Sequence, residues 1–330
     1  MQASAEWVNA PPGNSEGNSR LDWGPGVLSP VPNLMERTKI NSLRRRNTLI
    51  AWTFILPNFL GFALFTMIPV TASFVLAFME WDAFTPPRFT GLANFARLLT
   101  DDSVHIAIRN TIYYTVGTVP LTLVASLVLA ILLNNAIRGM GVFRTAIFFP
   151  YITSVVAVAF VWNMIFHPTM GPINSFLQSL GVENPPGWTA SSAWAMPAII
   201  ITSVWRFMGY YMVIFLAGLQ AIPKTLYEAA EIDGASPWGR FFNVTLPMLR
   251  PATFFVIVML TINCFRIFDL VQVMTQGGPG RATTVLVHQL YHSAFVRFNF
   301  GYASAIALVL FFMVIGITVV QFMVGKKYEV

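Results

Sequence analysis

Charged side chains are scarce in this chain. Asp, Glu, Lys and Arg together make up 10% of the residues, whereas 55% are hydrophobic. Because a soluble domain carries about 25% charged residues, this composition excludes an ordinary water-soluble protein. The one cysteine, Cys264, excludes a disulfide within the chain and a cysteine-rich metal site.

Recognisable catalytic motifs are also lacking. The phosphate-binding sequence G-x-x-x-x-G-K-[ST] is absent, so we expect the chain not to hydrolyse ATP itself. His288 and His292 have the spacing of a zinc-protease helix, but Gln289 stands where that motif requires Glu. We therefore expect no catalytic residue and no metal site. A membrane-embedded hydrolase is a rival interpretation, and the missing nucleophile–base pair counts against it.

Long apolar runs are the main positive feature. Crossing about 30 Å of hydrocarbon takes roughly 20 residues of helix, and six runs reach that length. The sequence therefore predicts an all-α membrane protein with six transmembrane helices, at Leu49–Phe78, Asn110–Leu133, Val142–Phe166, Ala193–Ala221, Ala252–Thr275 and Tyr302–Val324.

The distribution of Lys and Arg predicts the orientation, because cytoplasmic loops are enriched in these residues. With the N-terminus inside, the outer loops hold few basic residues, and nearby acidic residues offset them. The net positive charge then reflects topology and anionic lipid headgroups rather than nucleic acid. We expect both termini to be cytoplasmic, together with Arg37, Lys39, Arg44, Arg45, Arg46, Arg138, Arg144, Lys224, Arg240, Arg250, Lys326 and Lys327.

The chain divides at about residue 40. Residues 1–40 are rich in Pro, Gly, Asn and Ser and show no apolar periodicity, which predicts a disordered cytoplasmic tail. They lack the pattern of a signal peptide. Met35 is an alternative start to Met1. Residues 41–330 form the predicted six-helix transmembrane domain, with a polar cytoplasmic loop at about residues 222–251.

The loop at 222–251 has the local chemistry of two short helices and a turn. Pro223 fits a first helical turn, and Lys224 to Asp233 is rich in helix formers. Gly234 suits a left-handed helix end, and Ser236 followed by Pro237 begins a second helix. On these grounds alone, the loop is a helical hairpin lying on the membrane surface.

A resemblance gives this hairpin a partner. Glu228-Ala229-Ala230, then Gly234 after three residues, then Val244 and Leu246-Pro247, resembles the signature of importer permeases of the ATP-binding-cassette (ABC) class. The departure is Val244, where Ile is commoner. The resemblance implies the type I importer permease fold and a loop that couples to an ATPase through Glu228, Ala229, Ala230, Asp233, Gly234, Ala235, Leu246 and Pro247.

The resemblance also implies a complex in a bacterial or archaeal cell membrane. The expected partners are a second homologous permease, two cytoplasmic ATPase subunits and an extracytoplasmic binding protein. ATP and Mg²⁺ would be bound by the ATPases, with no cofactor on this chain. An ion-coupled secondary transporter is the other rival, and the sequence shows no interrupted helices around a carboxylate pair to support it.

Ionisable residues in the predicted spans mark the substrate pathway, since they are costly in hydrocarbon. Arg206 lies among Trp205, Tyr210 and Tyr211, whose rings offer faces for sugars. In the fifth span a polar stripe is expected at helical spacing, formed by Asn263, Arg266 and Asp269. The alternative is that Arg266 and Asp269 simply neutralise each other.

A second resemblance favours a carbohydrate. The segment from Trp205 to Pro223, and Phe268-Asp269-Leu270-Val271 followed by Gly277-Gly278-Pro279, are similar to the sugar-importer branch, of the maltose, lactose and glycerol-phosphate type. An anionic ligand such as glycerol phosphate is the alternative. By position, the resemblance and the polar residues together predict substrate contacts at Tyr151, Arg206, Gly209, Tyr210, Tyr211, Asn263, Arg266 and Asp269.

Overall fold

A computed structural model of the protein describes residues 34–134 and 139–326, in two compact units divided between Thr66 and Met67. In the first unit, helix α1 (Leu34–Phe62) leads into the π-helical turn η1 (Ala63–Met67). Because α1 begins at Leu34, the last residues of the predicted tail belong to a helix. The rest of that tail, residues 1–33, lies outside the described residues.

The second unit contains the long helices. Asp101 caps the start of α4, its side chain accepting a hydrogen bond from the backbone N–H of Ser103 at 2.8 Å. The unit comprises α2 (Ile68–Leu76), a two-stranded antiparallel sheet of β1 (Met79–Glu80) and β2 (Arg88–Phe89), α3 (Ala93–Leu98), α4 (Asp102–Leu132), α5 (Met140–Ile152), α6 (Val155–Ile165), α7 (Pro172–Ser179), η2 (Trp188–Ala190), α8 (Ala195–Gln220), α9 (Lys224–Ile232), α10 (Pro237–Arg240), η3 (Phe241–Thr245), α11 (Leu246–Met248), α12 (Arg250–Phe265), α13 (Asp269–Met274), α14 (Leu286–Tyr291), η4 (His292–Val296) and α15 (Phe300–Lys326).

The core forms where α4 packs against α8 and α12. Small hydroxyl side chains line the buried face of α4 and allow the helices to approach closely, and some return their hydroxyl to the preceding turn, as Thr115 does to the Thr111 carbonyl. Between the helices, the Tyr114 hydroxyl donates to Ser203 on α8 at 2.8 Å. The buried hydroxyl residues of α4 are Thr111, Thr115, Thr118, Thr122 and Ser126.

The third predicted span, Val142–Phe166, is wrong as a single helix. It consists of α5 and α6, which meet at an angle of 98°. Thr153 and Ser154 are extended between them, with ψ of 151° and 125°. The apolar run continues through the break, so hydrophobicity alone could not locate it. The predicted span therefore contains a helix break that the apolar pattern did not indicate.

The fifth predicted span, Ala252–Thr275, is also wrong at its outer end. Helix α12 ends at Phe265 with Arg266 as its C-cap, and α13 begins at Asp269. The expected helical spacing of Asn263, Arg266 and Asp269 therefore does not exist. At the other end, the segment Pro237–Met248 meets α12 at 62°.

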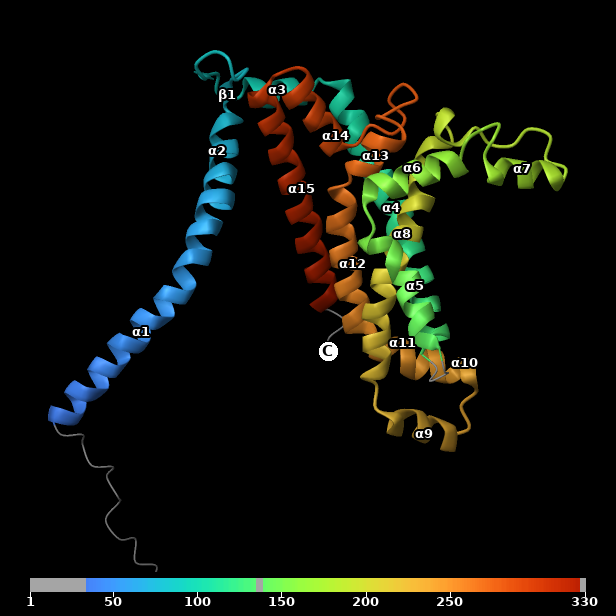
Figure 1. Cartoon of the computed structure of the whole chain (residues 1–330), viewed down its shortest axis with the longest axis horizontal. Coiled ribbons are helices and arrows are strands. Elements are labelled where there is room, and N and C mark those ends of the chain that lie inside the picture. Colours follow the sequence, from blue (N-terminus) through green and yellow to red (C-terminus); the bar gives the residue numbers. More distant parts are fainter. Residues whose placement is uncertain (1–33, 135–138, 327–330) are drawn as a thin grey trace, which may run out of the picture. The chain divides into compact units, whose positions relative to one another are not determined.

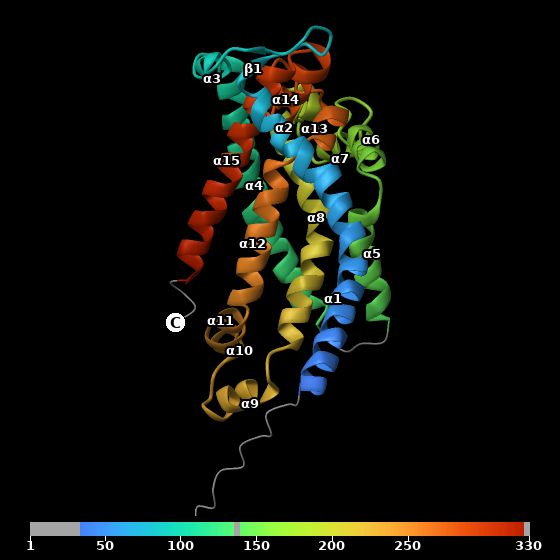
Figure 2. The same ribbon diagram turned by 90° about the vertical axis from the view of Figure 1, so that its left-hand side faces the viewer.

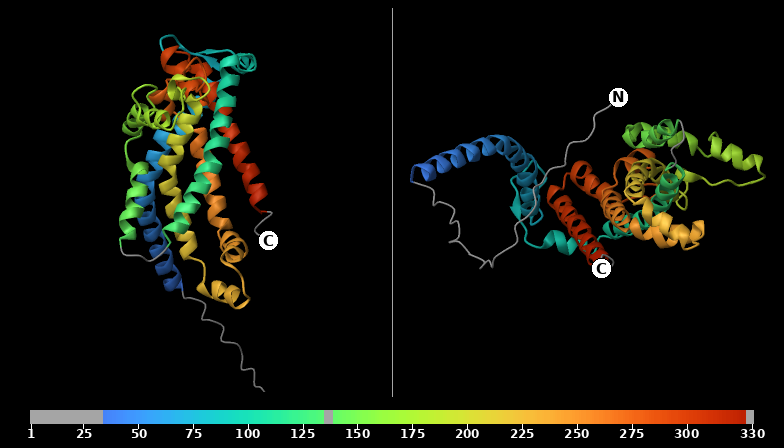
Figure 3. Two further views of the ribbon diagram at one scale, coloured as in Figure 1. Left: turned by 90° about the vertical axis from the view of Figure 1, so that its right-hand side faces the viewer. Right: turned by 90° about the horizontal axis from the view of Figure 1, so that it is seen from below.

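Among residues 34–134 and 139–326, four helices are long and apolar enough to cross a membrane, and up to six spans result if each bent pair counts as one. Figure 1 and Figure 2 place α9, α10 and α11 at one end of the long helices of the second unit. The sheet, α3, α13 and α14 lie at the opposite end. Figure 3 shows the same separation from the other side. The protein is therefore a multi-pass membrane protein, and in its second unit the loop at 222–251 lies at one end of the long helices and the sheet at the other.

Candidate functional site

Five of the eight predicted substrate residues lie on α5 and α8, which pack together: Tyr151, Arg206, Gly209, Tyr210 and Tyr211. Gly209 is buried there, and a Cβ atom at this position would lie 2.0 Å from the carbonyl oxygen of Ile147. Only glycine allows the two backbones this approach. Gly209 thus acts through packing in this structure, and the contact sets how the flanking side chains of α8 meet Tyr151 on α5.

Two tyrosines and an arginine form the centre of this cluster. The rings of Tyr151 and Tyr210 are stacked, with centroids 4.3 Å apart and planes inclined by 17°. The Arg206 guanidinium lies 5.5 Å from the Tyr151 ring centroid, and its Nη2 donates to the Tyr151 carbonyl oxygen at 3.4 Å. Its Nε is buried and has no hydrogen-bond partner in the described part of the chain. The Arg206 Nε–H is thus a buried donor that no described residue satisfies.

The third contribution comes from the end of α12. Asn263 donates from Nδ2 to the hydroxyl of Tyr211 at 3.1 Å. Tyr211 is fully buried, so this bond fixes the Asn263 amide rather than leaving the phenol free. The cluster therefore combines stacked aromatic faces, a guanidinium and an amide, which suits a ligand with many hydroxyl groups and apolar C–H faces.

Two predicted members lie apart from these hydrogen bonds. Arg266 and Asp269 flank the break after α12, and both are exposed. Within the described ranges, the single ion pair joins Arg240 and Glu231, so Arg266 and Asp269 do not neutralise each other there. Their predicted contact with substrate stays a prediction.

An aromatic neighbour was missed by the sequence analysis. Trp162 of α6 meets Trp205 of α8 edge to face, with ring centroids 5.5 Å apart. The only signal was a tryptophan in an apolar run, because the pairing depends on the sharp bend between α5 and α6. This contact ties the bend to the segment that carries Arg206.

The loop at 222–251 folds as its local chemistry predicts. Gly234 has φ of +73°, the left-handed conformation. Its N–H donates to the Glu231 carbonyl, and the N–H of Ala235 donates to the Ala230 carbonyl at 2.9 Å. These two bonds form a Schellman motif, which ends α9 at a fixed angle. Pro223 is the N-cap of α9 and so precedes its first turn.

Side chains then brace the two arms of the loop. Ser236 caps α10 by accepting a hydrogen bond from the Gly239 N–H. The hydroxyls of Tyr227 and Thr245 are 3.0 Å apart, and Arg240 meets Glu231 at 3.3 Å. The ion pair is exposed and contributes little energy. Together, however, these contacts hold α9 against the returning segment as one element.

The outer surface of this element is unusually apolar. Ile232, Trp238 and Phe242 are 87%, 73% and 56% exposed, beside the exposed Glu228 and Ala229. Exposed apolar groups of this size, gathered on a polar loop, are typical of a protein-binding surface. Over the residues that the structure describes, no group of three His, Cys, Asp or Glu side chains is placed to hold a metal ion.

The chain is similar to known transport proteins along most of its length. Residues 123–328 match the family described as "Binding-protein-dependent transport system inner membrane component". The chain is 40% identical over 288 residues to the probable ABC transporter permease YesP of Bacillus subtilis (strain 168), covering 86% of this chain and 92% of YesP. It is 35% identical to the lactose transport system permease LacF of Rhizobium radiobacter, over 89% of this chain and 99% of LacF.

The fold is also known from crystals. A chain of a bacterial ABC transporter that imports the acidic polysaccharide alginate superposes with a TM-score of 0.76 at 21% identity, covering 88% of this chain and 99% of that one. The expected importer permease fold is therefore confirmed. The chain belongs to the family of inner-membrane permease components of binding-protein-dependent ABC transport systems.

Proposed function

We propose that this permease carries a carbohydrate across the membrane. The observation that supports this most directly is the Tyr151–Tyr210 stack beside Arg206 and Asn263. Aromatic faces bind the C–H surfaces of sugar rings, and the guanidinium and amide donate to hydroxyl oxygens. The similarity to a lactose permease points the same way.

We also propose that the loop at 222–251 docks on a cytoplasmic ATPase. Its exposed Ile232, Trp238 and Phe242 supply the apolar contact area, and Glu228 supplies a charge for a basic partner. The braces at Tyr227 and Arg240 support transmission of movement as a rigid unit. ATP and Mg²⁺ would be bound by the ATPase chains, with no cofactor on this chain.

The proposed complex has two further parts. A second homologous permease supplies the other half of the pathway, and two ATPase subunits dock on the paired loops. An extracytoplasmic binding protein delivers the sugar, which the description of the family supports. The complex lies in the cell membrane of a bacterium or archaeon, with both termini inside as the basic residues favour.

In this scheme ATP and substrate act by alternating access. Closure of the ATPase dimer moves the paired loops, and α8 and α12 reorient so that the Tyr151–Tyr210 cluster faces outward. ATP hydrolysis then returns the Tyr151–Tyr210 cluster to the inward-facing state. Neither ATP nor sugar shifts this equilibrium except by binding the two states with different affinity.

The experiment is reconstitution of the full importer in proteoliposomes with its binding protein. Sugar-stimulated ATPase activity should be present in the wild type and lost in Glu228→Arg. Glu183→Arg makes the same charge change on an exposed loop residue and should behave as wild type. Normal stimulated hydrolysis by assembled Glu228→Arg would contradict the docking role.

An anionic sugar derivative is the second candidate. It is favoured by the buried, unpartnered Nε of Arg206 in the described structure. Guanidinium groups bind phosphate and carboxylate in pairs of hydrogen bonds. A ligand screen on the binding protein with neutral and acidic sugars separates the two candidates. Binding of amino acids or metal ions alone would contradict both.

A further inference from the structure

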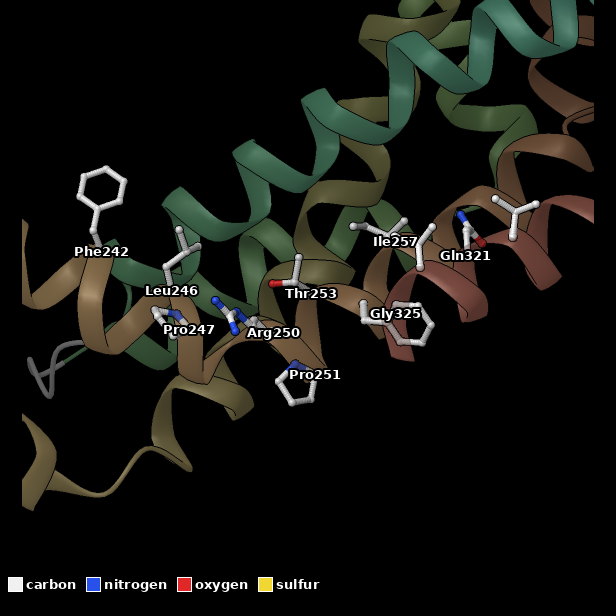
Figure 4. A pocket seen from close by; sticks show the side chains of 12 residues that line it. Phe242, Leu246, Pro247, Arg250, Pro251, Thr253, Ile257, Gln321 and Gly325 are labelled. Carbon is white, nitrogen blue, oxygen red and sulfur yellow. The ribbon is translucent and has the colours of Figure 1, made fainter. Parts of the chain in front are cut away.

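A groove lies between the loop at 222–251 and the last helix of the protein. Its volume is about 780 Å³, within the range of roughly 300–1,000 Å³ typical of small-molecule sites. It is formed by the segment Phe242–Pro247, the first half of α12 and the last turns of α15. Figure 4 shows Arg250 beside Pro247 and Thr253, with Gln321 and Gly325 on the α15 side. The lining residues are Phe242, Leu246, Pro247, Arg250, Pro251, Thr253, Phe254, Ile257, Val320, Gln321, Val324 and Gly325.

The walls are mostly apolar and partly open. Val320 and Val324 on α15 are 58% and 53% exposed, and the lining residue Phe254 packs edge to face on Phe322 of α15, with ring centroids 5.2 Å apart. A hydrocarbon chain is the chemistry that such walls favour, because it removes this surface from water.

One end of the groove is positively charged. Arg250 begins α12, is exposed, and forms no ion pair or hydrogen bond with any side chain that the structure describes. The N-terminus of α12 has no side-chain cap, so its dipole adds to the positive charge. Lys326, exposed at the end of α15, follows the lining residue Gly325. None of the lining residues is acidic.

A second polar group lies deeper in the groove. Gln321 donates from Nε2 to Thr261 at 3.0 Å, while its Oε1 is buried with no hydrogen-bond partner in the described part of the chain. Buried amide oxygens in native proteins are nearly always paired, so a donor from a ligand is expected there. A glycerol hydroxyl is such a donor.

We infer that this groove binds an anionic phospholipid, with its phosphate at Arg250 and an acyl chain along Ile257, Val320 and Val324. Basic pockets between transmembrane helices bind acidic lipid headgroups, and arginine matches phosphate with paired donors. Leu246 and Pro247 of the loop at 222–251 form one wall, so the lipid contacts that loop and the last helix together. The inference does not depend on which substrate the permease carries.

The test is lipid titration of the purified full-length protein, followed by native mass spectrometry, with dioleoyl phosphatidylglycerol and dioleoyl phosphatidylcholine as probes. Wild type should retain the anionic phosphatidylglycerol in preference to the phosphatidylcholine. Arg250→Gln should weaken that retention about tenfold, the loss of one charge-assisted phosphate contact. Arg281→Gln, an exposed arginine of the opposite end, is the matched control and should retain it as wild type does.

A second variant tests the apolar walls. Val324→Trp fills the groove from an exposed position, so the fold should survive and both lipids should bind less. Equal retention of the two lipids by wild type, or unchanged retention by Arg250→Gln, would overturn the inference.

A photoreactive side chain at position 324, in native membranes, decides between a lipid and a protein occupant. An adduct with the mass of one phospholipid supports the proposed site. A cross-linked product larger by a polypeptide would show that another chain occupies the groove and would overturn the inference.

Discussion

Gly209 and Ile147 bring α8 and α5 into backbone contact, since a Cβ atom on residue 209 would meet the Ile147 carbonyl oxygen at 2.0 Å. Gly209→Ala should therefore push the helices apart and lower the stability of the folded protein by about 1–3 kcal/mol. The measurement is the thermal unfolding midpoint in detergent. Gly316→Ala, on α15 where a Cβ meets nothing within 4 Å, is the control and should not be destabilised. Equal midpoints for both variants would contradict this packing role.

Gly234 has a conformational role that its neighbours do not share. At φ of +73° with open space around it, the cost of substitution comes from the backbone and not from a clash. Gly234→Asn, which tolerates the left-handed region, should preserve the loop, whereas Gly234→Val should distort it. Complex assembly with the ATPase, measured by co-purification, should fall in the valine variant alone. Loss in both variants would show that the side-chain volume matters instead.

Asn263 and Tyr211 test the proposed sugar contact separately from folding. Asn263→Ala removes a half-buried amide whose bond to Tyr211 is 3.1 Å long, so uptake should fall by about tenfold or more while binding-protein affinity is unchanged. Tyr211→Phe keeps the ring and frees the amide, so its effect on uptake should be smaller. A larger loss of uptake in Tyr211→Phe than in Asn263→Ala would assign the proposed sugar contact to the Tyr211 phenol instead.

Asp101 and Tyr302 give the protein an acid-sensitive link. The Tyr302 hydroxyl donates to the Asp101 carboxylate at 2.7 Å. Partial burial opposes ionisation of Asp101, but hydrogen bonds from Tyr302 and Ser103 and the nearby Arg97 prevail, so the pKa of Asp101 lies below its ordinary value of 3.8. The resulting stability is fully present above that value and is lost as the pH falls through the folded-state pKa.

Tyr302→Phe should therefore lower the unfolding midpoint at pH 7, by a loss of about 1 kcal/mol, and make stability less dependent on acid between pH 5 and 3. The midpoint is measured in detergent across that range. Tyr113→Phe, an exposed tyrosine on α4, is the control. An unchanged acid dependence in Tyr302→Phe would show that the hydrogen bond does not set the pKa of Asp101.

His288, like Asp101, makes the folded protein less stable in acid, but for a different reason. Burial on α14, and secondarily the charge of His292, hold the pKa of His288 below 6.5. The unfolded chain then binds the proton more readily, so stability falls as the pH drops below 6.5. His288→Gln should remove part of this dependence between pH 7 and 5, measured as the unfolding midpoint. A variant with the wild-type dependence would assign it to another group.

The sequence predicted best where structure is local. The loop at 222–251 depends on Gly234, Ser236 and Pro237, whose effects act within a few residues, and the predicted helix end and cap were both correct. The end of α12 carries no such signal. Neither glycine nor proline lies near Arg266, so the helix ends there through tertiary packing that a periodic pattern does not contain.

The break between α5 and α6 was missed for a related reason. Thr153 and Ser154 are small polar residues within a long, mostly apolar segment, and hydropathy cannot distinguish a straight span from one that turns by 98°. The Tyr151–Tyr210 stack depends on the close contact of α5 and α8 at Gly209, so its members could be named from their family positions but their contact could not be derived from spacing.

The early end of α5 also leaves main-chain carbonyl groups beside the proposed sugar site. The last carbonyl groups of a helix have no partner in the next turn, and the Tyr151 carbonyl oxygen accepts a hydrogen bond from Arg206. A side-chain substitution leaves these main-chain oxygens in place. For the proposed carbohydrate, alanine scanning would therefore underestimate the contribution of this segment to binding. Backbone amide-to-ester exchange at residues 152–154, which weakens the carbonyl acceptors of residues 151–153, would be the more sensitive probe.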